Sequence, residues 1–354
     1  MKHVLLDMAL DPRDVQRLQS LPGVTIHFSP APSKDLKDRP LPPEILKGKQ
    51  VLLCKRPPTN LSEATDLELM HLGTVGFEHL SEFKLYDSPL RVLNARGLFD
   101  TAISEWCLSM MINLVRDLPG MFRNQQAKTW SRDARFHQEI RHKTVGIWGY
   151  GGIGRDVARL AKAFGMTVHA LSRTGVKPRL LDYTPEGTGD LLGVLPDRVF
   201  NYDQKQEFLK GLDFLVLCIP RTASTTGIVG PAELAALKPT AWLLNVARGP
   251  IVQEAALIDV LKNQRIAGAA LDVHYAYPLP PEHPLWEMPN VILTPHISGS
   301  ELSTYFMARI GELFFQNLKR FLEGQPLLNE ITKEEWRETC GVGSVVFGSG
   351  RSDR

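Results

Sequence analysis

The length and composition of the chain predict an ordinary globular protein of two domains. The chain has 354 residues, and because domains hold roughly 150 residues, we expect two, each able to bury its own core. Hydrophobic residues make up 43% of the chain, charged residues make up 23%, and the formal net charge is +2. This balance gives no reason to expect a nucleic-acid or membrane partner, so we expect a small-molecule partner.

The cysteines and the first residues favour a reduced, cytoplasmic protein. Cys54, Cys107, Cys218 and Cys340 are far apart, and they form no CxxC pair. No histidine lies near them at metal-ligand spacing, so we expect free thiols and no metal site. Asp7 interrupts the short apolar run at the start of the chain, and no stretch reaches the roughly 18 apolar residues of a membrane span. We therefore expect neither a signal peptide nor an anchor.

The first 143 residues predict a small α/β region followed by a helix and an arm. Residues 3–8 and 50–54 have the apolar runs of buried strands, and polar turns with proline follow them. A helix is expected to run from Asp100 or Thr101, either of which suits an N-cap, to about residue 116. Residues 117–143 are polar and basic. They predict an extended arm, for which contact between the two copies of a homodimer is one use.

After residue 143, short apolar runs alternate with helical patterns, which is typical of βαβ units around a parallel sheet. The predicted strands are residues 144–149, 167–172, 213–219, 241–246, 267–273 and 291–294. Residues 174–199 form a long connection rich in glycine and proline, which predicts a functional or flexible flap. A helix at residues 302–322 is expected to end at Gly324, and the tail beyond Thr332 is expected to be loosely ordered.

A glycine-rich motif after the strand at 144–149 indicates a dinucleotide site. Its residues are Gly149, Tyr150, Gly151, Gly152, Ile153 and Gly154. A lone GxGxxG is weak evidence, but here the motif closes a predicted strand and opens a predicted helix. Gly149 permits the tight turn, Gly151 lets the backbone approach a pyrophosphate, and Gly154 allows close helix packing. The helix N-terminus would attract the phosphates. The alternative is a purely structural glycine turn.

The end of the second strand favours NADP over NAD as the cofactor. In an NAD site, an acidic residue about 20 positions after the first glycine binds the adenosine ribose. Here the corresponding residues are Ser172, Arg173 and Thr174. Ser172 and Thr174 can donate to a 2′-phosphate, and Arg173 can pair with it through its planar guanidinium. The alternative is that Arg173 is a solvated surface charge, and NAD stays possible.

Two further strand ends carry residues suited to catalysis. Arg248 and His296 follow predicted strands at their carboxyl ends, where open α/β sheets place ligands. A guanidinium there can hold a carboxylate and polarise the adjacent carbonyl. Histidine can move a hydroxyl proton near neutral pH. Either residue alone has a structural explanation, but the two together after a dinucleotide motif favour catalysis.

Several segments resemble the successive signatures of the D-isomer specific 2-hydroxyacid dehydrogenase family. They read GIWGYGGIGRDVARLAKAFG, LLNVARGPIV, IAGAALDV and HPLWEMPNVILTPHISG, with GTVGFEHL and NARGLFDTAISEW upstream. The resemblance runs from about residue 50 to residue 330. It implies an α/β protein with two Rossmann-like domains, each with a doubly wound parallel sheet, and a cleft between them. The substrate domain would comprise residues 1–102 and 298–331, the dinucleotide-binding domain residues 103–297, and the loosely ordered tail residues 332–354.

The resemblance also implies roles for individual residues. Arg248 would bind the substrate carboxylate together with the backbone of Val75 and Gly76, and His296 would be the acid/base. Asp272 would hold the nicotinamide carboxamide, although an ordinary turn carboxylate is the alternative. The other implied cofactor contacts are Thr101, which could instead be only a helix cap, and Cys218, Pro220, Thr225, Val246 and Ala247.

One position departs from the family pattern. Where relatives have a glutamate before proline to orient the histidine, this chain has Tyr277. A phenol is neutral at pH 7, so His296 should have a lower pKa than in relatives unless Glu282 replaces the acid. Formate dehydrogenases of the same superfamily have a neutral glutamine there and a similar PHISG run, but Phe99 falls near the position of their formate-binding asparagine. Tyr277 could also define a larger or aromatic substrate pocket.

Two function classes stay open at this point. The resemblance implies an NAD(P)-dependent oxidoreductase that transfers a hydride between nicotinamide and C2 of a small 2-keto or 2-hydroxy acid, with glyoxylate or hydroxypyruvate as candidate substrates. The alternative is a dinucleotide sensor or co-regulator with little catalysis, like the co-repressor relatives of the family. The missing glutamate supports the sensor. The presence of both Arg248 and His296 favours the enzyme, because a sensor needs neither.

Overall fold

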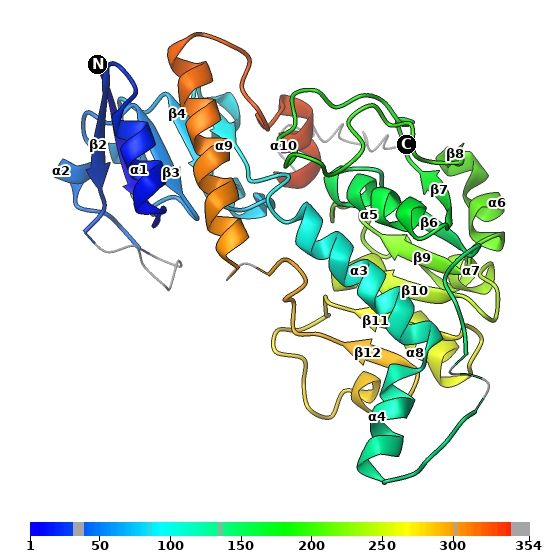
Figure 1. Cartoon of the computed structure of the whole chain (residues 1–354). Coiled ribbons are helices and arrows are strands. Elements are labelled where there is room, and N and C mark those ends of the chain that lie inside the picture. Colours follow the sequence, from blue (N-terminus) through cyan, green and yellow to red (C-terminus); the bar gives the residue numbers. More distant parts are fainter. Residues whose placement is uncertain (31–38, 84, 134, 136, 301–302, 341–354) are drawn as a thin grey trace, which may run out of the picture. The chain divides into compact units, whose positions relative to one another are not determined.

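The computed structural model describes residues 1–30, 39–83, 85–133, 135, 137–300 and 303–340 (Figure 1). The chain divides into two compact units. The first consists of Met1–Arg96 and Met307–Arg354, and the second is Gly97–Phe306. Each unit contains its own parallel sheet.

The first unit has a five-stranded sheet in the order β2-β1-β3-β4-β5, with every neighbouring pair parallel. The strands are β1 (Lys2–Asp7), β2 (Val24–Phe28), β3 (Val51–Cys54), β4 (Leu69–Leu72) and β5 (Arg91–Leu93). The helices are α1 (Pro12–Gln19), α2 (Pro43–Leu46), most of α9 (Thr304–Leu322) and α10 (Lys333–Cys340). The two strands predicted in this region are confirmed as β1 and β3, whereas β2, β4 and β5 were not predicted.

The prediction of a loose tail beyond Thr332 is wrong for its first part, because α10 is a capped and packed helix. The Glu335 N–H donates to Thr332 Oγ1 at 3.2 Å, and the Thr332 N–H donates to Glu335 Oε2 at 2.8 Å, which is a capping box. Trp336 is 5% exposed, and its ring lies edge-on to Phe77 with the centroids 5.7 Å apart. The rest of the predicted tail, residues 341–354, lies outside the described residues.

We expect Thr332→Ala to lower the free energy of unfolding by about 1 kcal/mol, because the Glu335 N–H loses its acceptor at the start of α10. Urea denaturation of the full chain, followed by tryptophan fluorescence, measures this change. Glu334→Gln alters an exposed residue of the same helical turn and should stay within about 0.5 kcal/mol of the wild type. Equal losses in the two variants would show that α10 does not depend on the capping box.

The second unit has a seven-stranded sheet in the order β12-β11-β10-β9-β6-β7-β8, again parallel throughout. The strands are β6 (Thr144–Trp148), β7 (Thr167–Leu171), β8 (Arg198–Phe200), β9 (Phe214–Leu217), β10 (Trp242–Asn245), β11 (Gly268–Leu271) and β12 (Val291–Leu293). All six strands predicted in this region are confirmed, and β8 is additional. The order changes direction between β6 and β9, the point at which doubly wound sheets bind dinucleotides. The predicted α/β class with doubly wound parallel sheets is confirmed.

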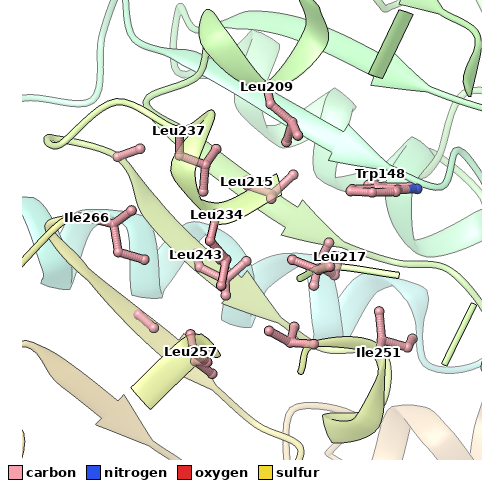
Figure 2. Close-up of a cluster of buried hydrophobic side chains, with 14 of the residues drawn as sticks. Trp148, Leu209, Leu215, Leu217, Leu234, Leu237, Leu243, Ile251, Leu257 and Ile266 are labelled. Atoms are coloured by element: carbon pink, nitrogen blue, oxygen red, sulfur yellow. The ribbon is translucent and has the colours of Figure 1, made fainter. Parts of the chain in front are cut away.

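Helices cover both faces of this sheet, so its strands are apolar on both sides. In β9, Phe214 and Val216 belong to the core formed with α3 (Asp100–Val115) and α5 (Gly152–Ala163). Leu215 and Leu217 belong to the opposite core, which α6 (Lys205–Lys210), α7 (Pro231–Ala235) and α8 (Glu254–Lys262) complete (Figure 2). Each buried leucine of this kind contributes roughly 1.5–3 kcal/mol of stability. The two cores fix the positions of the strand ends that carry the candidate site.

Two local predictions in this unit need correction. Helix α3 begins at Asp100, but its N-cap is Phe99 rather than Asp100 or Thr101. The predicted extended arm starts with a helix, α4 (Leu118–Gln126), because Asp117 accepts the N–H of Gly120 at 3.0 Å as its N-cap and a proline lies in its first turn. Residues 127–133 contain no helix or strand.

The described part of the chain contains no helix that is both long and apolar enough to cross a membrane. Over the same residues, no cluster of three or more histidine, cysteine, aspartate or glutamate side chains is arranged to hold a metal ion. All four cysteines are free, and Cys54 and Cys107 are buried.

Candidate active site

The glycine-rich loop between β6 and α5 has the conformation predicted for it. Gly149 has a φ of +102°, and a Cβ there would lie 2.9 Å from the carbonyl group of Cys218. A Cβ at Gly154 would collide with the Gly149 carbonyl oxygen and lie 2.9 Å from Ile147 Cγ2. The tight turn at Gly149 and the close packing of α5 at Gly154 are therefore confirmed.

Asp100 supplies a carboxylate to the N-terminus of α5. A Cβ at Gly152, the first residue of α5, would collide with this carboxylate. The position suits an anion, because a helix N-terminus carries partial positive charge. The same carboxylate adds to the effect of burial in raising the pKa of the Cys218 thiol. From the sequence alone, Asp100 is expected only as a cap of its own helix α3, so this contact was not predicted.

The flap at residues 174–199 is attached to the glycine loop and α5. Arg155 is 4% exposed, and it donates to the carbonyl oxygens of Asp190 and, at 2.5 Å, Lys177. The Tyr150 hydroxyl donates to Asp190 Oδ2 at 2.8 Å. The Asp190 carboxylate also accepts three consecutive backbone N–H groups, at residues 193–195, each at 3.0 Å. Burial and this carboxylate raise the pKa of Tyr150, so the hydroxyl is a donor at neutral pH.

The residues predicted to distinguish NADP from NAD follow β7. Ser172 Oγ donates to the Gly175 carbonyl oxygen at 2.9 Å, which closes a turn. Arg173 and Thr174 are exposed at the carboxyl end of the strand. In this geometry the carboxyl end of β7 carries a cation and two hydroxyls where an NAD site has a carboxylate.

Arg248 follows β10 on a loop that Asn245 holds in place. Asn245 is buried at the end of the strand, and it accepts the N–H of Ala247 at 3.0 Å and donates to the Arg248 carbonyl oxygen at 3.1 Å. The Arg248 guanidinium donates from Nη1 to the Ala247 carbonyl oxygen at 2.7 Å. The sequence analysis missed Asn245, although its place directly after the apolar run of β10 marks it as a strand-end residue.

His296 lies on a loop that Asp272 fixes on both sides. Asp272 follows β11, is fully buried, and accepts hydrogen bonds from Thr294 Oγ1 at 2.5 Å and from the Ile297 N–H at 2.9 Å. It also accepts the Ser298 N–H at 3.1 Å and Ser298 Oγ at 2.5 Å. His296 has a φ of +59°, a strained conformation for a residue other than glycine that the surrounding bonds must hold. Asp272 therefore positions the loop that carries His296.

Tyr277 faces His296 through its ring. The two ring centroids are 5.5 Å apart with an interplanar angle of 46°. The Tyr277 hydroxyl accepts the backbone N–H of His274 at 3.1 Å. Glu282, the alternative acid considered from the sequence, is a solvent-exposed residue of the following loop. The residue that faces the imidazole is thus Tyr277 and not a carboxylate.

The pKa of His296 lies below the ordinary histidine value. Partial loss of hydration is the main cause, the negative charge of Asp272 opposes it, and the neighbouring Arg248 and His274 act in the same direction as the loss of hydration. Arg248 and His296 each lie three residues beyond the end of their strand, and Leu271 of β11 pairs with both Asn245 of β10 and Leu293 of β12. The loops that carry the two side chains therefore leave the same edge of the parallel sheet.

His274 is a second histidine at this site that the sequence analysis missed. It is 6% exposed, and its Nε2–H donates to the Thr294 carbonyl oxygen at 2.8 Å. Its buried Nδ1 has no hydrogen-bond partner within the described chain. Its position one residue after the LDV sequence was the available signal.

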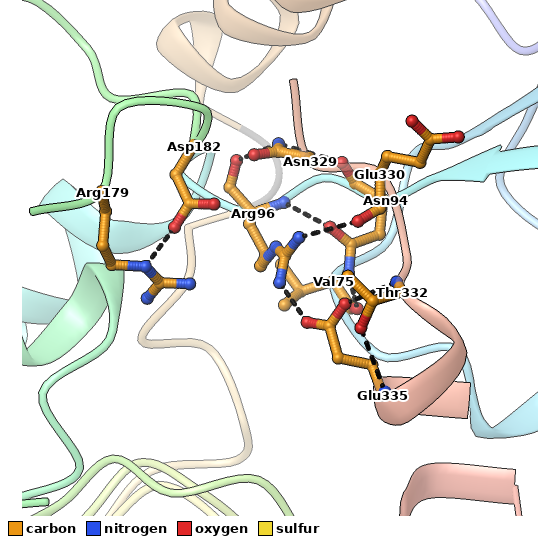
Figure 3. A network of polar contacts seen from close by, with 9 residues as sticks. All are labelled: Val75, Asn94, Arg96, Arg179, Asp182, Asn329, Glu330, Thr332 and Glu335. Carbon is orange, nitrogen blue, oxygen red and sulfur yellow. Dashed lines mark hydrogen bonds and ion pairs between the residues drawn. The ribbon is translucent and has the colours of Figure 1, made fainter. Parts of the chain in front are cut away.

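The loop with Val75 and Gly76 follows β4 in the first unit. Asn94 Nδ2 donates to the Val75 carbonyl oxygen at 3.1 Å, and Thr74 Oγ1 donates to the Gly76 carbonyl oxygen at 3.0 Å. Arg96 pairs with Glu335 of α10 in the same polar network (Figure 3). Because the carbonyls are engaged within the protein, the N–H groups are the polar groups of this loop that could serve a substrate.

The remaining predicted cofactor residues are arranged along three elements. Thr101 lies in the first turn of α3, and its buried Oγ1 has no hydrogen-bond partner among the described residues. Thr225 Oγ1 donates to the Pro220 carbonyl oxygen at 2.7 Å and so closes the loop after β9. Cys218 directly follows β9. Val246 and Ala247 directly follow β10, and both are buried. Apart from Thr101, these residues therefore lie after the carboxyl ends of β9 and β10.

Comparison with known proteins places this geometry in a family context. The model of the D-isomer specific 2-hydroxyacid dehydrogenase NAD binding domain matches residues 108–298. A glyoxylate reductase from Thermococcus gammatolerans is 32% identical over 316 residues, which cover 84% of this chain and 88% of that protein. A glyoxylate reductase from Thermofilum pendens is 29% identical over 297 residues, or 82% and 83% of the two chains. The crystal structure of a D-isomer specific 2-hydroxyacid dehydrogenase from Xanthobacter autotrophicus Py2 with NADPH and MES aligns with a TM-score of 0.72 at 27% identity, covering 94% of this chain and 98% of that chain.

Proposed function

Because the chain belongs to the D-isomer specific 2-hydroxyacid dehydrogenase family, we propose that it works as a 2-keto acid reductase with Arg248 and His296 at the reacting carbonyl. Family membership makes it an NAD(P)-dependent oxidoreductase that transfers a hydride between nicotinamide and C2 of a small 2-keto or 2-hydroxy acid. The observation that carries the proposal is that Arg248 and His296 lie on loops that leave the same edge of the parallel sheet, each three residues after its strand, β10 or β12. The comparisons do not favour the alternative of a dinucleotide sensor, and a sensor would not require this pair.

The residues of the second unit fit a dinucleotide. The glycine turn at Gly149, the close packing at Gly154 and the N-terminus of α5 meet at the switch point between β6 and β9. When bound there, the cofactor supplies the hydride. Thr101, whose buried hydroxyl has no hydrogen-bond partner in the described part of the chain, and the backbone around Cys218 and Val246 would surround the nicotinamide end.

The protein's own part in the reaction is to bind, polarise and protonate the substrate. Arg248 would hold the carboxylate through two parallel hydrogen bonds and draw electron density from the neighbouring carbonyl. The N–H groups of Val75 and Gly76 would bind the same carboxylate. His296 would donate a proton to the carbonyl oxygen as negative charge develops on it. Asp272 accepts hydrogen bonds from the loop that carries His296. It would also contact the nicotinamide carboxamide.

We propose glyoxylate or hydroxypyruvate as the substrate class, because the two relatives described above are glyoxylate reductases. The test is consumption of NADPH and NADH with a panel of 2-keto acids that includes glyoxylate, hydroxypyruvate, pyruvate and phenylpyruvate. The highest kcat/KM should belong to one of the first two. Preference for phenylpyruvate would support the aromatic pocket suggested for Tyr277, and no turnover with any acid would support the sensor. We also propose that the protein is cytoplasmic and that it forms a homodimer.

Arg173→Ala is expected to weaken NADPH binding about tenfold to a hundredfold and to leave NADH binding nearly unchanged, because a charge-assisted contact to the 2′-phosphate contributes about 1.5–3 kcal/mol. Dissociation constants from cofactor fluorescence measure the effect. Arg132→Ala, which removes an exposed arginine of the arm, is the matched control and should change neither value. Equal losses for both cofactors would assign Arg173 a structural role and remove the argument for NADP.

A further inference from the structure

The flap places a guanidinium at the phosphate end of the glycine loop. Arg179 Nη1 lies 3.4 Å from the position that a Cβ on Gly151 would occupy. Gly151 is the motif residue whose missing side chain lets a pyrophosphate approach the backbone. The space that the glycine leaves open is therefore bordered by an arginine from a segment outside the motif.

The position of Arg179 is held from several sides. Its Nε–H faces Asp182 in an ion pair (Figure 3), and its backbone N–H donates to the Leu191 carbonyl oxygen at 2.9 Å. Arg155 binds the flap on both sides of this residue, at Lys177 and Asp190. Arg179 also lies close enough to Arg155 for its charge to lower the pKa of that buried guanidinium, after the larger effect of burial. Arg179 of the flap and Arg155 of α5 thus place two cations beside the loop.

The helix N-terminus and Arg155 are not sufficient to balance the negative charge of a pyrophosphate at this loop. Asp100 already places a carboxylate at the N-terminus of α5, which offsets part of the attraction of the helix for phosphate. Arg155 directs both terminal nitrogens to flap carbonyls. In Arg179, Asp182 engages the Nε side of the guanidinium, and Nη1 is the atom near Gly151. An arginine fork matches phosphate oxygens well.

We infer that Arg179 binds the pyrophosphate of the dinucleotide and that the flap is therefore part of the cofactor site. The inference rests on the proposed cofactor binding and extends it to a residue outside the GxGxxG motif. The role differs from that of Arg173, which would read the 2′-phosphate found only in NADP. Arg179 would bind a group that NADH and NADPH share, so it contributes affinity without selecting between them.

Binding of NADH, NADPH and ADP to the full chain, measured by calorimetry without substrate, tests the inference. Arg179→Ala should raise all three dissociation constants by a similar factor of about tenfold to a hundredfold, as expected for loss of a charge-assisted contact. Arg179→Lys keeps the charge but not the planar fork, so it should recover part of the affinity. This second variant also preserves an ion pair with Asp182 and guards against simple loss of flap structure.

Lys177→Ala is the matched control, because it removes an exposed flap cation whose backbone, not its side chain, binds Arg155. It should leave all three constants nearly unchanged. A loss as large as that of Arg179→Ala would overturn the inference in favour of a general effect of flap charge. A loss confined to NADPH would instead place Arg179 at the 2′-phosphate, and unchanged binding would leave it a structural partner of Asp182. If the wild type bound neither NADH nor NADPH, the proposed function itself would fail, a result distinct from all of these.

Discussion

Arg248→Ala is expected to lower kcat/KM for the favoured 2-keto acid by roughly a hundredfold to several thousandfold, because removing one partner of a desolvated charge pair costs about 3–5 kcal/mol. The substrate carboxylate would lose its cation, and the carbonyl would lose the group that polarises it. The loop itself should persist, since Asn245 binds the backbone at residues 247 and 248 rather than the guanidinium. Cofactor binding should therefore change little.

Steady-state kinetics and cofactor fluorescence on the same preparations separate these effects. Arg248→Lys should rescue turnover poorly, because an ammonium cannot reproduce the planar fork. Asn245→Ala should also lower kcat/KM, because the loop that carries Arg248 would lose two hydrogen bonds to its backbone. Unlike Arg248→Ala, this variant should also disturb the buried contacts of the residues after β10. Near-normal turnover in Arg248→Ala would exclude this residue from the mechanism.

The parallel sheet of the second unit could be predicted because its strands are continuous apolar runs. The strands of the first unit are harder to predict from the sequence. β2 is half-exposed and β5 has three residues, so neither has a distinct period. β4 contains His71, which is fully buried beside Asn317 of α9, with the two side chains 3.3 Å apart. A polar residue whose partner lies 246 positions away looks like a break in an apolar run when only local sequence is considered.

Helices α4 and α10 were missed for a different reason. Both have local capping signals, at Asp117 and at Thr332 with Glu335. The polar composition around them predicts an extended arm and a loose tail, whereas these caps predict helix starts. In α10 the buried Trp336 also has its partner, Phe77, in a distant segment. Capping chemistry was therefore the more reliable guide to these helix starts than average polarity.

At the candidate site, the turn and packing roles of Gly149 and Gly154 follow from the motif itself, because they depend on backbone conformation alone. The contacts of Asp100 with Gly152 and of Arg155 with the flap join elements that are not adjacent in the sequence. No spacing rule could predict them. The family pattern did identify the position of Tyr277, and the structure adds that its ring faces His296.

Reduction by the wild type is expected to lose activity, as pH rises, at a midpoint below the ordinary histidine pKa of about 6.5. The protonated form of His296 must donate the proton, so activity falls as the imidazolium titrates. Loss of hydration, Arg248 and His274 all lower this pKa, and Asp272 raises it by a smaller amount than the loss of hydration lowers it. Tyr277→Glu would place a carboxylate in front of the ring. A negative charge favours the imidazolium, so the midpoint should move up by about one pH unit or more.

Profiles of kcat/KM against pH, with cofactor saturating, measure this titration before the substrate carboxylate pairs with Arg248. Tyr277→Gln is the matched control, because glutamine has nearly the size of glutamate without its charge. Both variants change the pocket equally, so a midpoint that rises with glutamate and not with glutamine must come from charge. His296→Asn should reduce kcat roughly a hundredfold to ten-thousandfold and abolish the midpoint, as expected on loss of a general acid. Identical midpoints for the glutamate and glutamine variants would mean that a carboxylate at position 277 does not act on His296. A midpoint that survives in His296→Asn would show that another group donates the proton. His274, which also acts on the pKa of His296, would then be the first histidine to replace.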